Sequence, residues 1–369
     1  RAFGIDRDAD RARRALDATY AGVDEIGEVT RREAIDCGYV KAGAVTIATS
    51  APQLRRLEAR ARGLGADRME LLSAGETAEC IHADHLRGGL RIADAARLDP
   101  ARLVRGLAEA CERRGVRIYE RTAATAIERG AVRCGALTVR APTVLRATES
   151  YTTQLPGRRL RYLPLYSLMI ATAPLSEATW AALGWRDGLL VDDGHYLFFY
   201  AQRTTDGRIA IGGRGAPYRL TSPIDERNER DQRVHARLSR TLVRAFPVVA
   251  DVPLTHHWGG PLAVPRDWTM SVTFDRASGL GAAGGYTGHG VVASNVSGRT
   301  LADLVLGRDS DLVTMPWVGH RSRSWEPEPI RFLASEAIVR TLGAADRRED
   351  ATDRAARRVG LLRPFLPPR

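Results

Sequence analysis

The sequence has few cysteines, and they show no pairing pattern. Cys37, Cys80, Cys111 and Cys134 are widely spaced, and no Cys-x-x-Cys pair occurs. This spacing indicates neither a disulfide framework nor a zinc site. Because free cysteines are typical of a reducing compartment, we expect a cytoplasmic protein.

Long apolar runs are also missing. No stretch of the sequence approaches the roughly 20 consecutive apolar residues that a membrane-spanning helix needs. The amino-terminal region is too rich in charge for a secretory signal peptide. The chain begins with Arg1 and not with Met, which is compatible with a fragment of a longer protein.

Lysine is almost absent, which helps to interpret the high net charge. The formal charge is +11 and the pI is near 10.0, yet Lys41 is the only lysine. The arginines alternate with Asp and Glu along the whole chain, whereas a nucleic-acid-binding protein gathers its basic residues in a patch or stripe. We therefore expect no nucleic-acid partner.

The remaining composition is that of a globular protein. The chain has 369 residues, of which 44% are hydrophobic and 27% are charged. This length is sufficient for two domains and a sizeable core. Composition alone indicates no particular activity.

The most informative stretch is residues 279–307. A short apolar strand leads into the loop Gly284-Gly285-Tyr286-Thr287-Gly288-His289-Gly290, and a helical pattern follows. Glycine lets the backbone approach a ligand closely, and the first N–H groups of a helix are unpaired at its positive end. Such a loop suits an anion, or a group that becomes an anion during a reaction. The alternative is a tight turn in any α/β domain, and the spacing alone does not decide between the two.

This stretch resembles the carboxy-terminal flavin loop of the D-amino-acid oxidase-like family of FAD-dependent oxidoreductases, which includes sarcosine, glycine and glutamylputrescine oxidases. The family pattern is Gly-aromatic-Ser/Thr-Gly-His-Gly, a run of small residues, Gly-Arg-x-Leu-Ala-Asp and a closing Gly. The matching residues are Gly285 to Gly290, Gly298, Arg299, Leu301, Ala302, Asp303 and Gly307. The resemblance implies that the loop backbone lies along the flavin ring, with the helix end facing the ring edge where negative charge collects on reduction.

Other segments are similar to the same family. Asp99 and Pro100 begin a predicted helix, and residues 116–120 after it have the composition of a strand. Residues 122–127 and 138–150 resemble the adenine-side strand and its Ala-Thr-Gly end, although Glu149 and Ser150 replace glycines. Two plain sheet strands are the alternative for these segments. Further predicted elements are a helix over 6–35, strands over 39–48, 165–172 and 196–201, a hairpin turn at Asp206-Gly207 and a helix over 225–245.

The resemblance implies a mixed α/β fold in which a Rossmann-like FAD-binding domain is interleaved with a mixed-sheet substrate domain. Residues 98–155 and 275–312 are assigned to the FAD-binding domain, and residues 37–97 and 156–274 to the substrate domain. Residues 1–36 are expected to form a helical segment joining the domains, and residues 313–369 a carboxy-terminal strap and tail.

The largest departure from the family concerns the phosphate-binding loop. The family begins with a strand, a Gly-x-Gly-x-x-Gly loop, a helix and an acidic residue that binds the ribose. We assign no such fingerprint to this sequence. The first segment of a typical member is therefore expected to be missing, which leaves the FAD-binding domain incomplete at its amino-terminal side. The alternative to an enzyme is thus a truncated, non-catalytic remnant with weak or no FAD binding.

The cofactor implied by the resemblance is noncovalent FAD, because no cysteine lies near Trp258, where some members attach the flavin. The candidate cofactor-binding residues are Ala124, Ala147, Thr148, Trp258, Gly259, Gly285, Tyr286, Thr287, Gly288, His289, Gly290 and Val291. No metal site is expected, since the adjacent His256 and His257 would point to opposite faces of a strand.

The implied reaction is oxidation of the C–N bond of an amine or amino acid by hydride transfer to the flavin, with oxygen or another acceptor reoxidising it. Sarcosine oxidase-like members place a lysine two residues after Gly-His-Gly to hold the substrate carboxylate, and this chain has Val292 there. Arg203, Arg214 and His289 are the candidate catalytic residues, the two arginines as replacements for that lysine. Projection of both arginines into solvent is the alternative. We expect a preference for amines over amino acids.

Overall fold

The larger part of the molecule is built on a mixed sheet of eight strands. The computed structural model describes residues 9–63, 65–213, 218–221 and 224–365. Strands β1 and β9 pair in parallel, and the other neighbours pair antiparallel. In spatial order the strands are Leu254–Val264 (β12), Leu163–Thr172 (β8), Ile209–Gly213 (β11), Phe199–Arg203 (β10), Leu190–Asp193 (β9), Ala44–Ala48 (β1), Gly88–Ile92 (β3) and Met69–Ser73 (β2). The predicted mixed sheet is confirmed.

Helices cover one face of this sheet. Alternate strand residues, among them Leu168, Ile170 and Ile211, are fully buried against α5 (Glu177–Leu183) and α6 (Gln232–Ala245). Successive residues of a strand point to opposite faces, so the residues between them face the other way. Helix α3 (Ala74–Ala78) packs against β2 and β3, whereas α2 (Ala51–Ala61) packs on the opposite face at this end of the sheet, with Leu57 against Ala48 and Leu90.

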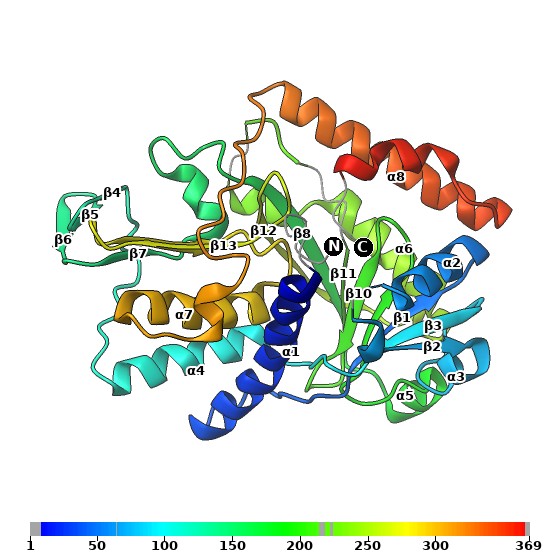
Figure 1. The fold of residues 1–369 in the computed structure, drawn as a ribbon. Coiled ribbons are helices and arrows are strands. Elements are labelled where there is room, and N and C mark those ends of the chain that lie inside the picture. Colours follow the sequence, from blue (N-terminus) through cyan, green and yellow to red (C-terminus); the bar gives the residue numbers. More distant parts are fainter. Residues whose placement is uncertain (1–8, 64, 214–217, 222–223, 366–369) are drawn as a thin grey trace.

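The second part of the molecule is built on a small sheet, in the order β13 (Ser271–Asp275), β14 (Leu280–Gly284) and β7 (Val144–Arg146). Figure 1 shows α7 (Gly290–Leu306) and α4 (Pro100–Arg113) beside this sheet, with α1 (Ala9–Arg32) running between the two parts. A separate three-stranded sheet contains β4 (Ala126–Glu128), β5 (Ala131–Cys134) and β6 (Leu137–Arg140).

Several predicted elements are present, and one is not. The helix after Asp99 is α4, and the Asp99 carboxylate accepts hydrogen bonds from the N–H groups of Ala101 and Arg102, as expected of an N-cap. The strand predicted over 116–120 is wrong, because those residues form turns and irregular chain. Its side chains are exposed, and no described strand pairs with this segment. A strand needs a hydrogen-bonded neighbour, whatever its composition.

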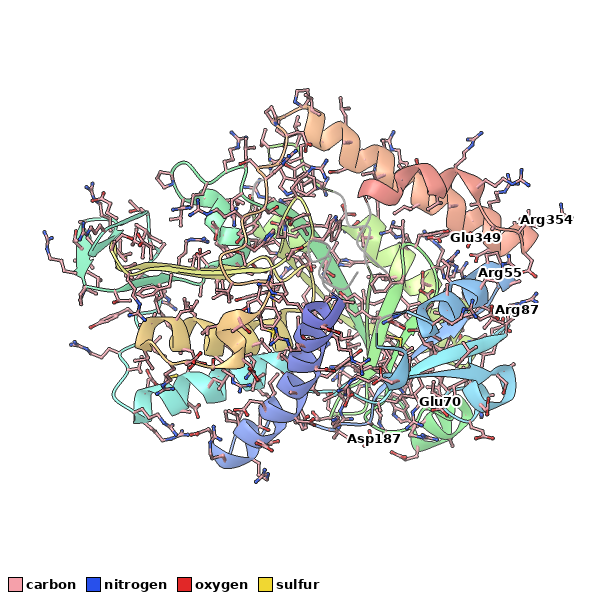
Figure 2. All side chains as sticks on the ribbon, viewed as in Figure 1. Arg55, Glu70, Arg87, Asp187, Glu349 and Arg354 are labelled. Carbon is pink, nitrogen blue, oxygen red and sulfur yellow. The ribbon has the colours of Figure 1, made fainter. Side chains whose placement is uncertain are left out.

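Charged side chains of both signs are spread over the surface. Figure 2 shows Arg55, Arg87 and Arg354 on the same side of the molecule as Glu70. Among the described residues, no helix combines the length and the apolar character that crossing a membrane requires.

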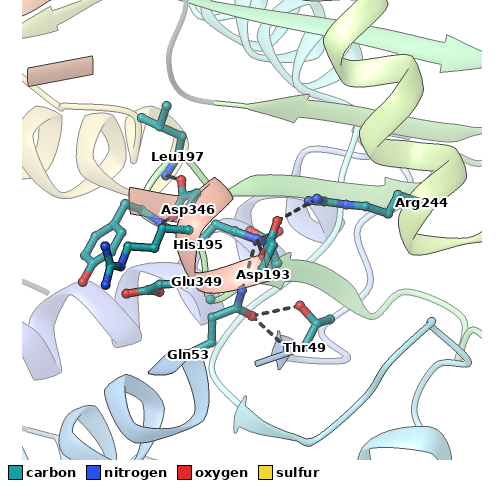
Figure 3. Close-up of polar contacts among 12 residues, drawn as sticks. Thr49, Gln53, Asp193, His195, Leu197, Arg244, Asp346 and Glu349 are labelled. Atoms are coloured by element: carbon teal, nitrogen blue, oxygen red, sulfur yellow. Dashed lines mark hydrogen bonds and ion pairs between the residues drawn. The ribbon is translucent and has the colours of Figure 1, made fainter. Parts of the chain in front are cut away.

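Helix α8 (Ile330–Thr352) lies across the large-sheet part and is attached to it through carboxylates. The Asp346 side chain accepts hydrogen bonds from the backbone N–H groups of Tyr196 and Leu197, at 2.8 and 2.9 Å (Figure 3). Glu349, one turn further along the same face of the helix, is fully buried. Within the predicted carboxy-terminal strap and tail, residues 313–369, the helix therefore begins only at Ile330 and has a polar, buried contact face.

Candidate functional site

The glycine-rich loop adopts the predicted arrangement of strand, loop and helix. Strand β14 ends at Gly284, and α7 begins at Gly290. Gly285 and Gly288 have positive φ angles of 84° and 102°, which glycine adopts without strain. Gly307, with φ of 69°, ends the helix in the left-handed conformation, as expected of a helix C-cap.

One side of the loop is packed and the other is open. Gly285 is buried, and a Cβ added to it would lie 2.6 Å from Cγ of Pro265. Gly288, His289 and Gly290 are exposed. Since a Cβ added to Gly290 would meet nothing within 4 Å, free space lies beside the backbone where α7 begins.

A carboxylate binds the packed side of the loop. Strands β7 and β14 run in parallel, so the chain after β7 lies next to the chain after β14. Glu149, three residues after β7, accepts hydrogen bonds from the N–H groups of Gly285 at 2.9 Å and Tyr286 at 3.0 Å. Burial raises the pKa of Glu149, and these two hydrogen bonds and the charge of Arg146 oppose the rise without cancelling it. Burial and the charge of Glu149 raise the pKa of Tyr286 to about 12.

The open face of the large sheet forms a polar and aromatic wall, which we call the sheet wall and define as Ser167, Met169, Tyr200 and Trp258. Ser167 and Met169 alternate with buried residues of β8, and Tyr200 lies between two buried residues of β10. Trp258 of β12 lies opposite Met169 on the same face. The hydroxyl groups of Ser167 and Tyr200 are 2.5 Å apart, and Trp258 is 40% exposed. A Cβ added to Gly260, opposite Ser167, would meet nothing within 4 Å, so there is room above this part of the wall.

The two arginine candidates are not brought to the sheet wall by any described contact. Arg203 lies on β10 in phase with buried Ala201, and its guanidinium stacks on Trp180 of α5 at 4.4 Å. It therefore points to the helix-covered face, opposite Tyr200. Arg214 lies outside the described residues.

The structure separates the other cofactor candidates. Ala124 lies just before β4, in the chain that borders the β4–β5–β6 sheet. Ala147 is exposed, and the Thr148 hydroxyl lies 2.9 Å from that of Thr152. A Cβ on Gly259 would collide with Leu168 at 2.1 Å, so this glycine serves packing on the helix-covered side. The remaining candidates, Tyr286, Thr287, His289 and Val291, lie in the loop and the first turn of α7, and Val291 is 39% exposed.

The adjacent histidines take part in separate contacts. His257 packs against His235 of α6 at 4.9 Å between ring centroids, and His256 lies 2.9 Å from the Thr255 hydroxyl. Within the described part of the chain, no group of three or more His, Cys, Asp or Glu side chains could hold a metal ion.

A cavity of about 640 Å³ lies away from the loop. Asp193, His195, Arg244 and Asp350 line it, and no residue of the glycine-rich loop does. These charged groups are already paired with one another, because His195 contacts both carboxylates and Arg244 contacts Asp350. The loop and the sheet wall, and not this cavity, are therefore the candidate functional site.

Three residues that the sequence does not single out as site residues are central to this arrangement. In the sequence, Glu149 stands out only as a replacement for a glycine, and Ser167 and Tyr200 only as members of predicted strands. A carboxylate directly after an Ala-Thr strand end, beside a glycine-rich loop, is the available signal for Glu149. Ser167 and Tyr200 cannot be paired without the register of β8, β10 and β11.

The loop fits the ring end of an FAD molecule. The N-terminus of α7 has no side-chain cap, and the space beside Gly290 is open, so backbone N–H groups of the first turn can face a ring edge that becomes anionic. The expectation that the Gly-x-Gly-x-x-Gly spacing is missing needs a correction, because Gly279, Gly281 and Gly284 have this spacing. They border or lie in β14, however, and Cβ atoms on Gly279 and Gly281 would collide with Pro142 and Leu145. These glycines serve strand packing and do not form a phosphate-binding loop before a helix.

Comparisons with known proteins concern the family and the fold. A model of the family described as "FAD dependent oxidoreductase" matches residues 2–304. "Probable oxidoreductase OrdL" of Rhizobium meliloti is 30% identical over 263 residues, which are 69% of this chain and 58% of that protein. "Gamma-glutamylputrescine oxidoreductase" of Escherichia coli is 28% identical over 313 residues, 81% of this chain and 69% of that protein.

Solved structures share the fold. Glycine oxidase from Geobacillus kaustophilus superposes with a TM-score of 0.68 at 20% identity, covering 83% of this chain and 82% of that one. The mixed α/β architecture predicted from the sequence is thus that of a known flavoprotein fold. With a family match over most of its length, the chain belongs to the FAD-dependent oxidoreductases of the D-amino-acid oxidase-like family.

Proposed function

We propose that this protein oxidises the C–N bond of a small amine or amino acid with noncovalent FAD as the cofactor. The observation on which the proposal rests is that an open glycine-rich loop and most of the sheet wall, namely Ser167, Met169 and Trp258, lie along the same pair of strands, β8 and β12. Thr287 N–H donates to the Ala263 carbonyl of β12 at 3.3 Å, and Trp258 lies farther along that strand. When bound, FAD accepts two electrons and the hydrogen of the substrate C–H bond, and the resulting imine is hydrolysed.

In this proposal the protein orients the substrate and supports the loop. Trp258 and Met169 offer apolar surface to the substrate chain, while the paired hydroxyl groups of Ser167 and Tyr200 offer polar contacts. Positioning of this kind contributes much of the rate acceleration in enzymes that leave the bond chemistry to a cofactor. The names of two similar proteins refer to γ-glutamylputrescine and to glycine, which supports an amine-bearing substrate.

We further propose that amines are preferred over the corresponding amino acids. None of the four sheet-wall residues is cationic, and Arg203 stacks on Trp180 on the opposite face. Lys41 is paired with Asp24 at 2.7 Å and Asp94 at 3.0 Å. Binding of a carboxylate that loses its water and gains no cationic partner costs several kcal/mol before relaxation. The corresponding amine has no carboxylate and avoids this cost.

The test is a substrate panel on the protein supplied with excess FAD. Each amino acid is paired with its decarboxylated amine, and bleaching of the flavin's visible absorbance is followed without oxygen. We expect the amines to reduce the flavin faster, and Tyr200→Phe to slow reduction by about tenfold through loss of one hydrogen bond. Tyr151→Phe, at an exposed position, is the matched control. A consistent preference for the amino acids would contradict the proposed specificity, and no reduction by either class would contradict the proposed function.

A second test separates FAD binding from folding. Gly290→Val adds a side chain in free space beside the loop, so we expect normal stability but at least about tenfold weaker FAD binding, since overpacking typically costs about 1–3 kcal/mol. Gly298→Val, also in free space but farther along α7, should leave binding unchanged. Gly285→Val should instead destabilise the fold, because of its positive φ and the contact with Pro265. FAD titration and urea unfolding measure both quantities, and equal FAD affinity in Gly290→Val and wild type would assign the loop to structure alone.

A further inference from the structure

The carboxylate of Glu149 supplies the hydrogen-bond acceptors for the glycine-rich loop. One oxygen, Oε2, accepts from Gly285 N–H, and the other, Oε1, accepts from Tyr286 N–H. Two successive N–H groups directed at one anion form a concave anion-binding arrangement of the backbone. In the described structure, the anion held there is a side chain of the protein itself.

The backbone around Glu149 is held firmly in place. Its φ of +42° lies in the left-handed region, which non-glycine residues adopt rarely and only where the surroundings enforce it. The next residue, Ser150, is buried, and its hydroxyl donates to the Pro261 carbonyl of β12 at 3.0 Å. Arg146, also buried, donates to the Thr152 hydroxyl. Glu149 is thus fixed between the small sheet and the end of β12.

The position of this carboxylate determines which part of the loop stays open. Gly285 is buried, and Tyr286 is half-buried against a hydrophobic cluster that includes Val272, Val296 and Trp317. Gly288, His289 and Gly290 follow at once and are exposed. Because Glu149 satisfies the N–H groups at the start of the loop, the N–H groups available to a ligand are those at the beginning of α7.

We propose that Glu149 is a positioning residue for cofactor binding, which holds the loop in the shape that presents the first turn of α7 to the flavin. This inference rests on the proposed function, in which FAD is the ligand of the loop. Glu149 does not have to touch the cofactor to act, since it works through the backbone of Gly285 and Tyr286. Removal of the carboxylate should therefore weaken FAD binding while the rest of the fold persists.

The decisive variant is Glu149→Gln, which keeps the size of the side chain. A glutamine amide has one acceptor oxygen and a donor NH₂ group, so it can satisfy only one of the two N–H groups. Hydrogen exchange at Gly285 and Tyr286 should become faster, and FAD should bind about tenfold or more weakly, as loss of a hydrogen bond to a charged group predicts. Glu149→Asp, which keeps the carboxylate, should restore part of both effects.

A matched control is available on the small β4–β5–β6 sheet. Glu128→Gln removes an exposed carboxylate on β4 that pairs only with Arg133 at the surface among the described contacts, and it should change neither measurement. Unchanged exchange at Gly285 and Tyr286 in Glu149→Gln would overturn the proposal. Faster exchange at these two residues together with tighter FAD binding would also overturn the proposal, because the Glu149 carboxylate of the wild-type protein would then compete with the cofactor for the loop. If the wild-type protein binds no FAD, the proposed function fails, and the exchange measurement still decides whether Glu149 fixes the loop.

Discussion

Replacement of Arg56 by methionine is expected to lower the free energy of unfolding by about 3–5 kcal/mol, a large fraction of the stability of a typical domain. The Glu349 carboxylate is fully buried and accepts a hydrogen bond from Arg56 Nη1 at 2.8 Å. Arg56 also donates to the Gly194 carbonyl at 2.7 Å. Its removal therefore leaves the buried Glu349 carboxylate without a cationic partner, with the Ala356 N–H as its one remaining described donor, and takes a donor from the Gly194 carbonyl, so α8 should separate from α2.

The double variant tests the cause of this loss. Arg56→Met with Glu349→Leu removes both charges, and it should recover most of the stability, because two apolar groups need no pairing. Glu336→Ala, which breaks a pair with the largely exposed Arg340 on the same helix, should change stability by no more than about 0.5 kcal/mol. Urea unfolding measures all of these variants. If Arg56→Met and Glu336→Ala proved equally mild, the buried pair would not be what holds α8.

Raising the pH from neutral to about 10 is expected to loosen the same helix at a second point. His195 is buried, with Nδ1 2.5 Å from an oxygen of Asp193 and Nε2 2.7 Å from an oxygen of Asp350 on α8. Burial lowers the pKa of His195, but the charges and hydrogen bonds of Asp193 and Asp350 outweigh it and raise the pKa to about 10. Arg244 also pairs with Asp350, at 2.7 Å.

The sign of the pH effect follows from the direction of the shift. Because the folded-state pKa of His195 lies above the ordinary value of 6.5, its contribution to stability is fully present below pH 6.5 and is lost as the pH rises through about 10. Each pKa unit corresponds to about 1.4 kcal/mol. Unfolding measured at several pH values should therefore show a decline that His195→Gln removes and that His85→Gln, at an exposed histidine, retains. An identical pH profile in His195→Gln and the wild type would contradict this assignment.

Local patterns in the sequence are sufficient for much of the fold. The glycine-rich loop, the N-cap Asp99 and the turn at Asp206-Gly207 depend on neighbours in the chain, and the structure confirms them. The strand over 116–120 fails because strand formation depends on a partner elsewhere in the chain. For the same reason Glu149 cannot be connected with Gly285 from the sequence, since 136 residues separate them and only the parallel pairing of β7 with β14 brings them together.

The long pairing of β8 with β12 joins the two halves of the proposed site in one rigid unit. The ladder extends from Leu163 and Val264, beside the loop, to Thr172 and Leu254 at the far end. Three of the wall side chains, Ser167, Met169 and Trp258, project from this ladder, but its hydrogen bonds are formed by backbone atoms alone. Substitutions at Ser167 or Met169 can therefore alter what the wall accepts without shifting the loop. In evolutionary terms, a lineage with this arrangement can change its substrate one residue at a time and retain its cofactor.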